Sequence, residues 1–188
     1  MNKLLIRLFD IVFSFAGLLI LFPVFFVITL CLFSESKYPF IIQQRVGKNQ
    51  KTFKIYKYRT MKLDTIETST HKVSSERLTA FGKILRKTKI DELPQLLNVF
   101  IGNMSLVGPR PNLLTQIELT NKRNKKNIYE VKPGITGLSQ IRKIDMSTPQ
   151  LLVETDYEMI KSFSLIKYFQ YIFLTIFGKG QGDIINEK

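Results

Sequence analysis

The sequence predicts an α+β fold that is mainly helical, and three observations lead to this prediction. An uncharged apolar run covers residues 11–33. Two segments rich in β-branched and aromatic residues, 38–46 and 52–61, are separated by GKNQK, which is typical of a β-hairpin. Apolar residues then recur with helical spacing at several places within 78–177. With 45% hydrophobic residues in a chain of 188, one domain with a modest core is expected and a disordered chain is excluded.

The apolar run predicts a membrane segment, because it exceeds the roughly 18 residues typical of one and carries no charge. Pro23 lies in the middle of the run and pushes Phe22 away from helical geometry, so we expect a kink there. Each half is about 12 residues or about 18 Å long, which is shorter than a hydrocarbon core of about 30 Å. Basic residues flank both ends of the run: Lys3, Arg7, Lys37, Arg45, Lys48 and Lys51.

These features favour a re-entrant membrane helix over residues 1–36, with both ends on one side of the bilayer. The alternative is a spanning helix with a proline kink, since prolines are tolerated in spanning helices, and the sequence leaves both open. A signal peptide is disfavoured because no small-residue cleavage site follows the run.

The hairpin and the later helices can be placed from their patterns. The second hairpin strand carries Lys54, Lys57 and Arg59, which predicts one cationic face, and residues 64–77 are expected to form a polar loop. The segment from Leu93 to Ile101 predicts a helix that ends at Gly102, with Pro94 in its first turn, and residues 132–137 predict a tight turn. The run 165–177 is too short to span a bilayer, so it is either core or a surface-lying helix. Apolar residues with helical spacing also occur at Leu78, Phe81, Ile84 and Leu85. They predict an interfacial amphipathic helix, although a helix packed on a core has the same pattern.

The net charge of +13 and the isoelectric point near 9.8 indicate an anionic partner, which could be a nucleic acid, an acidic membrane or a phosphorylated small molecule. Cys31 is the single cysteine, so an intrachain disulfide is excluded. His71 is the single histidine and lies in a polar stretch, where a surface position is expected.

Asp91 and Glu92 are the candidate catalytic residues. Neighbouring side chains on a helix point about 100° apart, which favours two distinct roles for the carboxylates. One can bind Mg²⁺, which prefers hard oxygen ligands and keeps substrate phosphates in its shell, while the other attacks or accepts a proton. An acidic pair at a helix start also interacts well with the helix dipole, and that ordinary explanation stays open. Nearby cations are candidate phosphate ligands, with Arg110 the best because Pro109 and Pro111 restrict its backbone: Lys57, Arg59, Arg86, Lys87 and Arg110.

Four segments in this order, QQRVG at 43–47, FKIYKYRTM at 53–61, LRKTKIDELPQLLNVFIGNMSLVGPRP at 85–111 and VKPGITGLSQI at 131–141, closely resemble the bacterial sugar transferases. These are small monotopic phosphoglycosyl transferases. The resemblance implies that a sugar 1-phosphate passes from a UDP-sugar to polyprenyl (undecaprenyl) phosphate with release of UMP. Asp91 would attack and carry the phosphosugar, and Glu92 would support Mg²⁺ binding. Substrate phosphates or nucleotide would lie near Arg86, Arg110 and Pro111, with Lys57 and Arg59 less securely placed.

The resemblance further implies that residues 37–188 form a catalytic domain on the cytoplasmic face of the inner membrane, in contact with membrane lipids. No nucleic acid is then expected as a partner. Two competing hypotheses are a non-catalytic basic membrane-anchored binding module and an inactive member of the family that serves as a scaffold. The identity of the sugar does not follow from the sequence.

Overall fold

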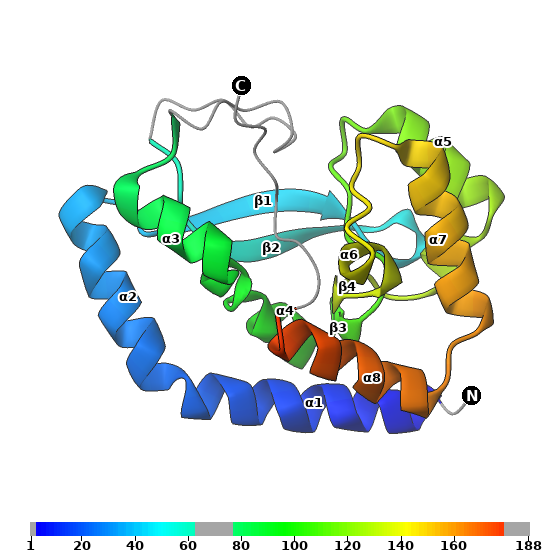
Figure 1. The fold of residues 1–188 in the computed structure, drawn as a ribbon, viewed down its shortest axis with the longest axis horizontal. Coiled ribbons are helices and arrows are strands. Elements are labelled where there is room, and N and C mark those ends of the chain that lie inside the picture. Colours follow the sequence, from blue (N-terminus) through cyan, green and yellow to red (C-terminus); the bar gives the residue numbers. More distant parts are fainter. Residues whose placement is uncertain (1–2, 63–76, 179–188) are drawn as a thin grey trace.

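The computed structural model describes residues 3–62 and 77–178, and it confirms an α+β chain dominated by helices (Figure 1). In chain order the helices are α1 (Lys3–Ile20), α2 (Phe22–Glu35), α3 (Ala80–Thr88), α4 (Gln95–Ile101), α5 (Ile117–Lys125), α6 (Leu138–Ile141), α7 (Pro149–Lys161) and α8 (Leu165–Ile176). The strands are β1 (Phe40–Val46), β2 (Thr52–Tyr58), β3 (Ser105–Val107) and β4 (Gly134–Thr136). Three short 3₁₀ turns matter below: η1 (Lys48–Gln50), η4 (Ile90–Glu92) and η5 (Ile128–Glu130).

The apolar run forms two helices, α1 and α2, which are bent by 59° where they meet at Leu21. The expectation that Phe22 lies outside helical geometry is wrong, because Phe22 begins α2 and Pro23 occupies its first turn. A proline there loses no intrahelical hydrogen bond, since the first N–H groups of a helix have no partner within it. Within the described residues, no single helix is long and apolar enough to cross a membrane, whereas the bent pair together meets that criterion.

Both ends of the bent pair are fastened to the rest of the chain. Near the start of α1, the Arg7 guanidinium donates to the carbonyl oxygens of Val99 and Phe100, at 2.6 and 2.7 Å. At the end of α2, Glu35 Oε1 accepts a hydrogen bond of 3.2 Å from the backbone N–H of Phe81, in the first turn of α3. Both ends of the pair are therefore attached to the same body of the protein.

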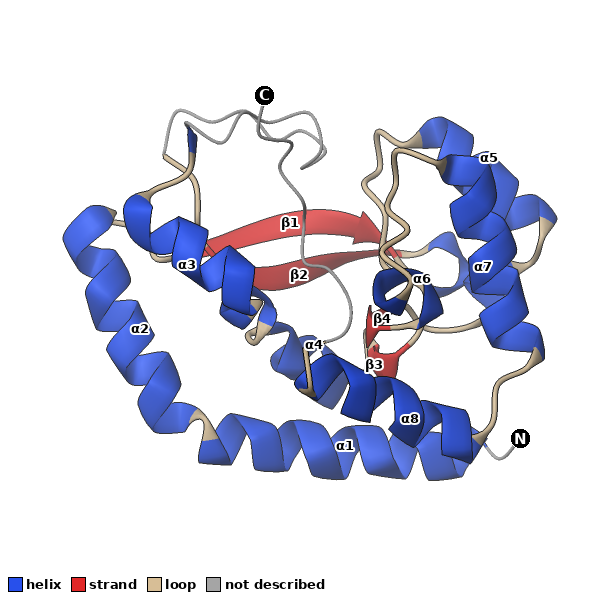
Figure 2. Cartoon of the chain, viewed as in Figure 1, coloured by secondary structure: helices blue, strands red, loops and turns tan. Residues whose placement is uncertain are grey.

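The strands β1 and β2 form the expected antiparallel hairpin, paired along their full length (Figure 2). The prediction of one cationic face is wrong, because Lys54 is exposed while Lys57 is buried. Three positions apart on a strand, the two side chains point to opposite faces. Asn98 on α4 joins the helix to β2, since its Nδ2 donates to the Lys54 carbonyl at 2.7 Å and its Oδ1 accepts from the Tyr56 N–H at 3.1 Å. This fixes α4 beside the strand that carries Lys57.

The helix expected at residues 93–101 is confirmed as α4, which directly follows Pro94 and ends at Gly102 in the left-handed region, with φ of 97°. The amphipathic stripe before it forms α3, in which Leu85 is buried while Ile84 is 55% exposed. Between the two helices, Lys89 adopts a φ of 58° and turns the chain into η4. The polar loop expected at 64–77 lies, apart from its last residue, outside the described residues.

The tight turn expected at residues 132–137 contains a strand instead, because β4 pairs in parallel with β3. Two glycines make this pairing close: a Cβ placed on Gly134 would lie 2.0 Å from the backbone nitrogen of Gly108. The Gly108 N–H also donates to the Thr136 carbonyl at 2.9 Å. The backbone that leads into Arg110 is therefore packed directly against β4.

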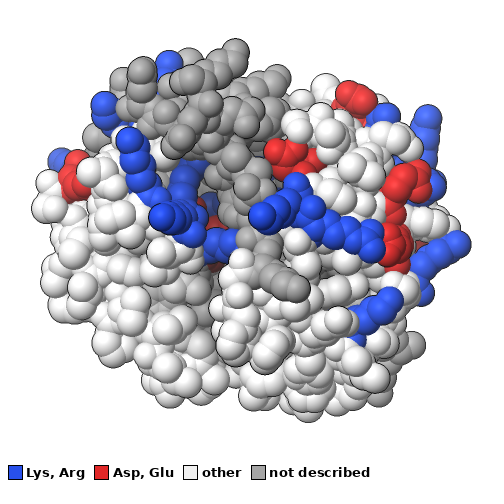
Figure 3. Space-filling view, viewed as in Figure 1, with Lys and Arg blue, Asp and Glu red and all other residues white. Residues whose placement is uncertain are grey.

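The sequence leaves open whether residues 165–177 belong to the core or form a surface-lying helix, and helix α8 has one buried and one exposed face. Tyr168 and Tyr171 are buried in the core, whereas Ile166 and Ile176 are 81% and 74% exposed. In Figure 3 the lower part of the view, where α1 and α8 lie, is white, while Lys and Arg side chains gather across the middle of the same face. Large apolar side chains are also exposed on α1, α2 and α4: Leu4, Leu8, Phe15, Leu19, Phe26, Val27, Leu97 and Ile101.

Candidate functional site

Three of the predicted site residues meet at one carboxylate oxygen. Glu92 Oε1 accepts hydrogen bonds from Lys57 Nζ at 2.9 Å and from Arg110 Nη2 at 2.6 Å. Glu92 and Lys57 are buried, and the side chain of Arg110 is 19% exposed. Hydrogen bonds between charged groups are strong when they are shielded from water, so this cluster holds both cations in fixed directions.

Three separate elements supply these side chains. Lys57 comes from the inward face of β2, Glu92 from the turn η4, and Arg110 from the segment that follows β3. Asp91 is adjacent to Glu92 in η4 and is also buried, with 6% of its surface exposed. Both carboxylates therefore precede α4 rather than lie on it, and the turn brings Glu92 to the pair of cations.

Lys89 is a member of this cluster that the sequence did not indicate. Burial lowers the pKa of Lys89 below its usual value, the Glu92 carboxylate raises it, and the Arg110 guanidinium lowers it. The basic stretch around Lys89 does not indicate that its side chain reaches Glu92 and Arg110. That direction depends on the left-handed backbone conformation of Lys89, which the sequence does not reveal. With Lys89 the cluster has a net excess of cations, which favours the binding of phosphate oxygens.

The other three predicted residues, Arg86, Arg59 and Pro111, have different surroundings. Arg86 Nε donates to Thr60 Oγ1 at 2.8 Å, and Arg86 Nη1 is buried with no hydrogen-bond partner among the described residues. Arg59 Nε donates to the carbonyl of Tyr38 at 2.9 Å, at the start of the hairpin. Pro111 is buried and follows Arg110 in the chain. The roles of these residues in substrate binding stay predictions.

A buried network holds the backbone of the segment that carries Arg110. Arg123 Nη1 donates to the Arg110 carbonyl at 2.8 Å and to Asn112 Oδ1 at 3.1 Å, while its Nη2 donates to Asp156 Oδ2 at 2.6 Å. Asp156 in turn accepts a 2.7 Å hydrogen bond from Ser139 Oγ. Sequence reasoning missed this network. The signal that could have found it is Asp156 itself, an ionisable residue spaced among the apolar positions of α7.

The residues of η4 fit a magnesium ion only together with a substrate. Among the described residues, no group of three or more His, Cys, Asp or Glu side chains lies together as a metal site. Mg²⁺ is commonly bound by one or two carboxylates plus phosphate oxygens, which Asp91 and Glu92 can satisfy.

Comparison with known proteins identifies the family to which this arrangement belongs. The sequence model described as bacterial sugar transferase matches residues 1–180. The chain belongs to the bacterial sugar transferase family. This confirms the resemblance drawn from the four motifs, and with it the expectation that the chain is a phosphoglycosyl transferase.

Three relatives show how far the similarity extends. The exopolysaccharide production protein PSS of Rhizobium leguminosarum bv. phaseoli is 35% identical over 192 residues, which cover 94% of this chain and 95% of the relative. The UDP-glucose:undecaprenyl-phosphate glucose-1-phosphate transferase of Escherichia coli (strain K12) is 37% identical over 94% of this chain, but this chain spans only 40% of that relative. The UDP-N-acetylgalactosamine-undecaprenyl-phosphate N-acetylgalactosaminephosphotransferase of Aeromonas hydrophila is 37% identical over 72% of this chain and 34% of its own length.

Proposed function

We propose that the chain transfers a sugar 1-phosphate from a UDP-sugar to polyprenyl phosphate, releases UMP, and thereby starts the assembly of a glycoconjugate or polysaccharide. The observation that carries the proposal is the buried Asp91–Glu92 turn, at which Lys57 and Arg110 converge on one carboxylate oxygen. Two relatives name undecaprenyl phosphate together with UDP-glucose or UDP-N-acetylgalactosamine. Because the two names differ in the sugar, they support the reaction and leave the sugar of this chain open.

Asp91 is the proposed nucleophile. One of its carboxylate oxygens forms a bond to the β-phosphorus of the UDP-sugar, while the bond from that phosphorus to the bridging oxygen breaks and UMP leaves with the oxygen. An oxygen of polyprenyl phosphate then attacks the same phosphorus, which breaks the bond to Asp91 and regenerates the carboxylate. One phosphoanhydride is broken and one is made, so a covalent intermediate divides the transfer without any further reactant.

The cations around η4 bind and orient the diphosphate in this proposal. Arg110 and Lys57 are held by Glu92, so they can contact anionic oxygens without a large loss of side-chain freedom. The buried Nη1 of Arg86 is a donor that a phosphate oxygen could satisfy. Mg²⁺ held by Asp91 and Glu92 would supply additional screening of the charge that repels the attacking carboxylate. Glu92 positions the two cations and supports the metal.

We further propose that α1 and α2 form a re-entrant pair in the inner membrane, with residues 37–188 as the catalytic domain on the cytoplasmic face. The attachment of both ends of the pair to the same body supports this topology. The exposed apolar side chains of α1, α2, α4 and α8 support contact with membrane lipids. A site at this surface lets a water-soluble donor meet a lipid-borne acceptor.

The decisive experiment measures UMP release from a panel of UDP-sugars by detergent-solubilised protein, with polyprenyl phosphate and Mg²⁺. Asp91→Asn should abolish turnover, whereas Glu118→Gln, which changes an exposed carboxylate of α5, should leave it unchanged. With a UDP-sugar labelled in the sugar and no lipid acceptor, the label should remain on denatured wild-type protein but not on Asp91→Asn. Full turnover by Asp91→Asn would refute the nucleophile, and no release from any donor would favour the binding-module or scaffold hypothesis.

A further inference from the structure

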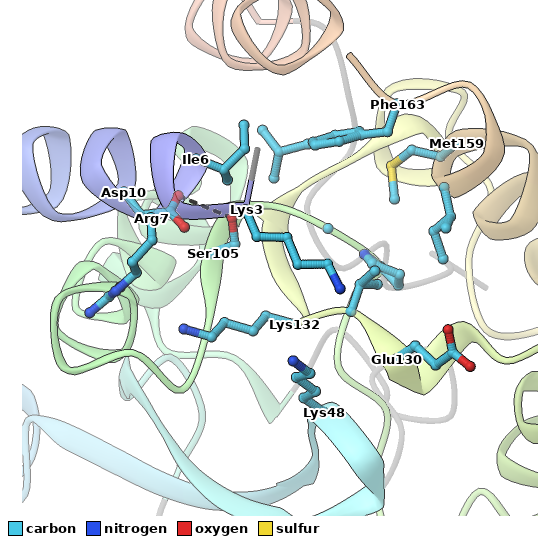
Figure 4. Close-up of a pocket in the computed structure, with 15 residues that line it drawn as sticks. Lys3, Ile6, Arg7, Asp10, Lys48, Ser105, Glu130, Lys132, Met159 and Phe163 are labelled. Carbon is cyan, nitrogen blue, oxygen red and sulfur yellow. Dashed lines mark hydrogen bonds between the residues drawn. The ribbon is translucent and has the colours of Figure 1, made fainter. Parts of the chain in front are cut away.

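A cavity of about 320 Å³ lies beside the first turns of α1 (Figure 4). Its walls come from α1, η1, the end of β3, the segment before β4, and the end of α7. Its lining residues do not include Lys57, Asp91, Glu92 or Arg110, so the cavity is separate from the cluster at η4. Nothing in the proposed transfer reaction uses it.

Four cationic side chains line this cavity: Lys3, Arg7, Lys48 and Lys132. Figure 4 shows the ammonium groups of Lys3 and Lys48 directed into the same space, and Lys132 extending towards Arg7. The Arg7 guanidinium is already bonded to two backbone carbonyls of α4. Within the described part of the chain, the three lysines form no ion pair. Their charge is therefore available to a ligand.

The two carboxylates of the cavity, Asp10 and Glu130, offset the charge of its four cations only in part. Asp10 Oδ1 accepts hydrogen bonds from Ser105 Oγ at 3.0 Å and from the Tyr168 hydroxyl at 2.9 Å, which turn it towards the core. Glu130 lies on the far side of the cavity from Arg7 (Figure 4). Burial lowers the pKa of Lys132, Arg7 and Lys48 lower it further, and Asp10 raises it. The cations thus repel one another, and a bound anion would relieve that repulsion.

One wall of the same cavity is apolar: Ile6, Val107, Met159, Ile160 and Phe163. A ligand that carries a negative head next to an apolar body matches both walls. We propose that this cavity is a second anion-binding site, which takes a phosphate ester carried either by a lipid headgroup or by a free phosphate compound. The proposal is independent of the transfer reaction, because none of the four cationic side chains that would hold the anion is part of the cluster at η4.

The position of the cavity connects it to the candidate site. Pro109 lines the cavity, and the next residue in the chain, Arg110, binds Glu92. Gly108, which also lines the cavity, is packed tightly against Gly134. An occupant of the cavity therefore lies against the backbone that directs Arg110.

The test uses full-length protein in a non-ionic detergent, with ¹³C-methyl methionine as the reporter. Met159 lines the cavity, while the buried Met104 packs in a different cluster, with Ile55 and Val99, and serves as the internal reference. Three probes are titrated: dihexanoyl phosphatidic acid, inorganic phosphate, and dihexanoyl phosphatidylcholine, which has the same tails without a net negative charge. Lys48→Gln and Lys132→Gln are compared with Lys125→Gln, which removes the same charge from an exposed position on α5.

Phosphatidic acid should shift the Met159 signal saturably in wild type and in Lys125→Gln, and should bind about tenfold or more weakly to Lys48→Gln and Lys132→Gln. A matching response to inorganic phosphate would identify a free phosphate compound as sufficient, whereas a response to phosphatidic acid alone would identify a lipid headgroup. The proposal is overturned if neither anion moves Met159, if phosphatidylcholine binds as well, or if Lys125→Gln weakens binding equally. Lys48 is exposed, so its replacement tests the site even if Lys132→Gln fails to fold.

Discussion

Arg110 is held at both ends, by Glu92 at its guanidinium and by Arg123 at its backbone. Its Nη2 lies 2.6 Å from Glu92 Oε1, and its carbonyl oxygen accepts a 2.8 Å hydrogen bond from Arg123 Nη1. Pro109 and Pro111 restrict the backbone on either side. A side chain that is fixed in this way loses little conformational freedom when a phosphate binds, which is what a transfer reaction requires of it.

Replacing Arg110 with lysine should slow transfer although it keeps the charge. Lysine presents a compact ammonium in place of a planar fork, so it cannot contact Glu92 and a phosphate oxygen with the same geometry. The loss of one charged hydrogen bond predicts a rate of UMP release about 10- to 100-fold lower. Lys122→Arg on α5, away from the site, is the control. An Arg110→Lys enzyme within twofold of wild type would show that charge alone matters here.

Asp156→Asn should destabilise the protein by about 3–5 kcal/mol, because it leaves the fully buried Arg123 with an uncompensated charge. The matched control is Glu154→Gln, which breaks an exposed pair with Lys126 at 3.0 Å on the same helix and should cost less than about 1 kcal/mol. Denaturant unfolding in detergent measures both. Equal effects of the two substitutions would mean that burial does not govern the Arg123 pair.

Gly134→Ala should also be strongly destabilising, by about 3 kcal/mol, since the new methyl group would overlap the backbone of Gly108 and force the paired strands apart. Gly17→Ala is the informative contrast. Its methyl would meet only the Leu96 side chain, at 3.1 Å, and alanine favours the helix, so its effect should stay within about 1 kcal/mol. The melting temperatures of the two variants distinguish them, and a stable Gly134→Ala protein would contradict the close pairing of β3 and β4.

The elements that the sequence predicts well are those with a local signal. The hairpin follows from two strands around GKNQK, and α4 from its apolar spacing and Gly102. The site is predicted in part for the same reason, since Glu92 and Arg110 lie in unusual local patterns. Their meeting at one oxygen could not be predicted, because it depends on the packing of β2, η4 and the segment after β3.

The sequence predictions that are wrong or incomplete also have physical explanations. A turn composition at 132–137 gave no hint of β4, because that strand exists only through its pairing with β3. A residue before a proline disfavours helical geometry, which predicts that Phe22 lies outside the helix. The break falls one residue earlier, at Leu21, and Pro23 fits the first turn of α2. Lys89 acts through contacts that no sequence spacing reveals. The place of Asp156 among the apolar positions of α7 indicates burial, but it does not identify Arg123 as the partner.

The Lys132 ammonium should make stability depend on pH. Its pKa is lowered from 10.5, chiefly by burial, so the folded state binds this proton less tightly than the unfolded chain. The charged lysine therefore costs stability below its lowered pKa, and this cost disappears as the pH rises to 10.5. In buffers without multivalent anions, Lys132→Met should raise the melting temperature at neutral pH and lose that advantage in alkali. Lys125→Met should do neither; an unchanged melting temperature of Lys132→Met would contradict the prediction.

The topology of the bent pair can be tested with cysteine labelling, since Cys31 is the single native cysteine. In a Cys31→Ser background, Lys3→Cys marks the start of α1, and Lys125→Cys marks the catalytic portion on α5. If α1 and α2 re-enter, as their attachments to α4 and α3 favour, a membrane-impermeant maleimide should label both positions from the cytoplasmic side only. In a spanning arrangement the hydrogen bonds from Arg7 to Val99 and Phe100 could not form, because α1 and α4 would begin on opposite sides of the bilayer. Labelling of Lys3→Cys from the outside would therefore refute both the re-entrant pair and the cavity that Lys3 and Lys132 share.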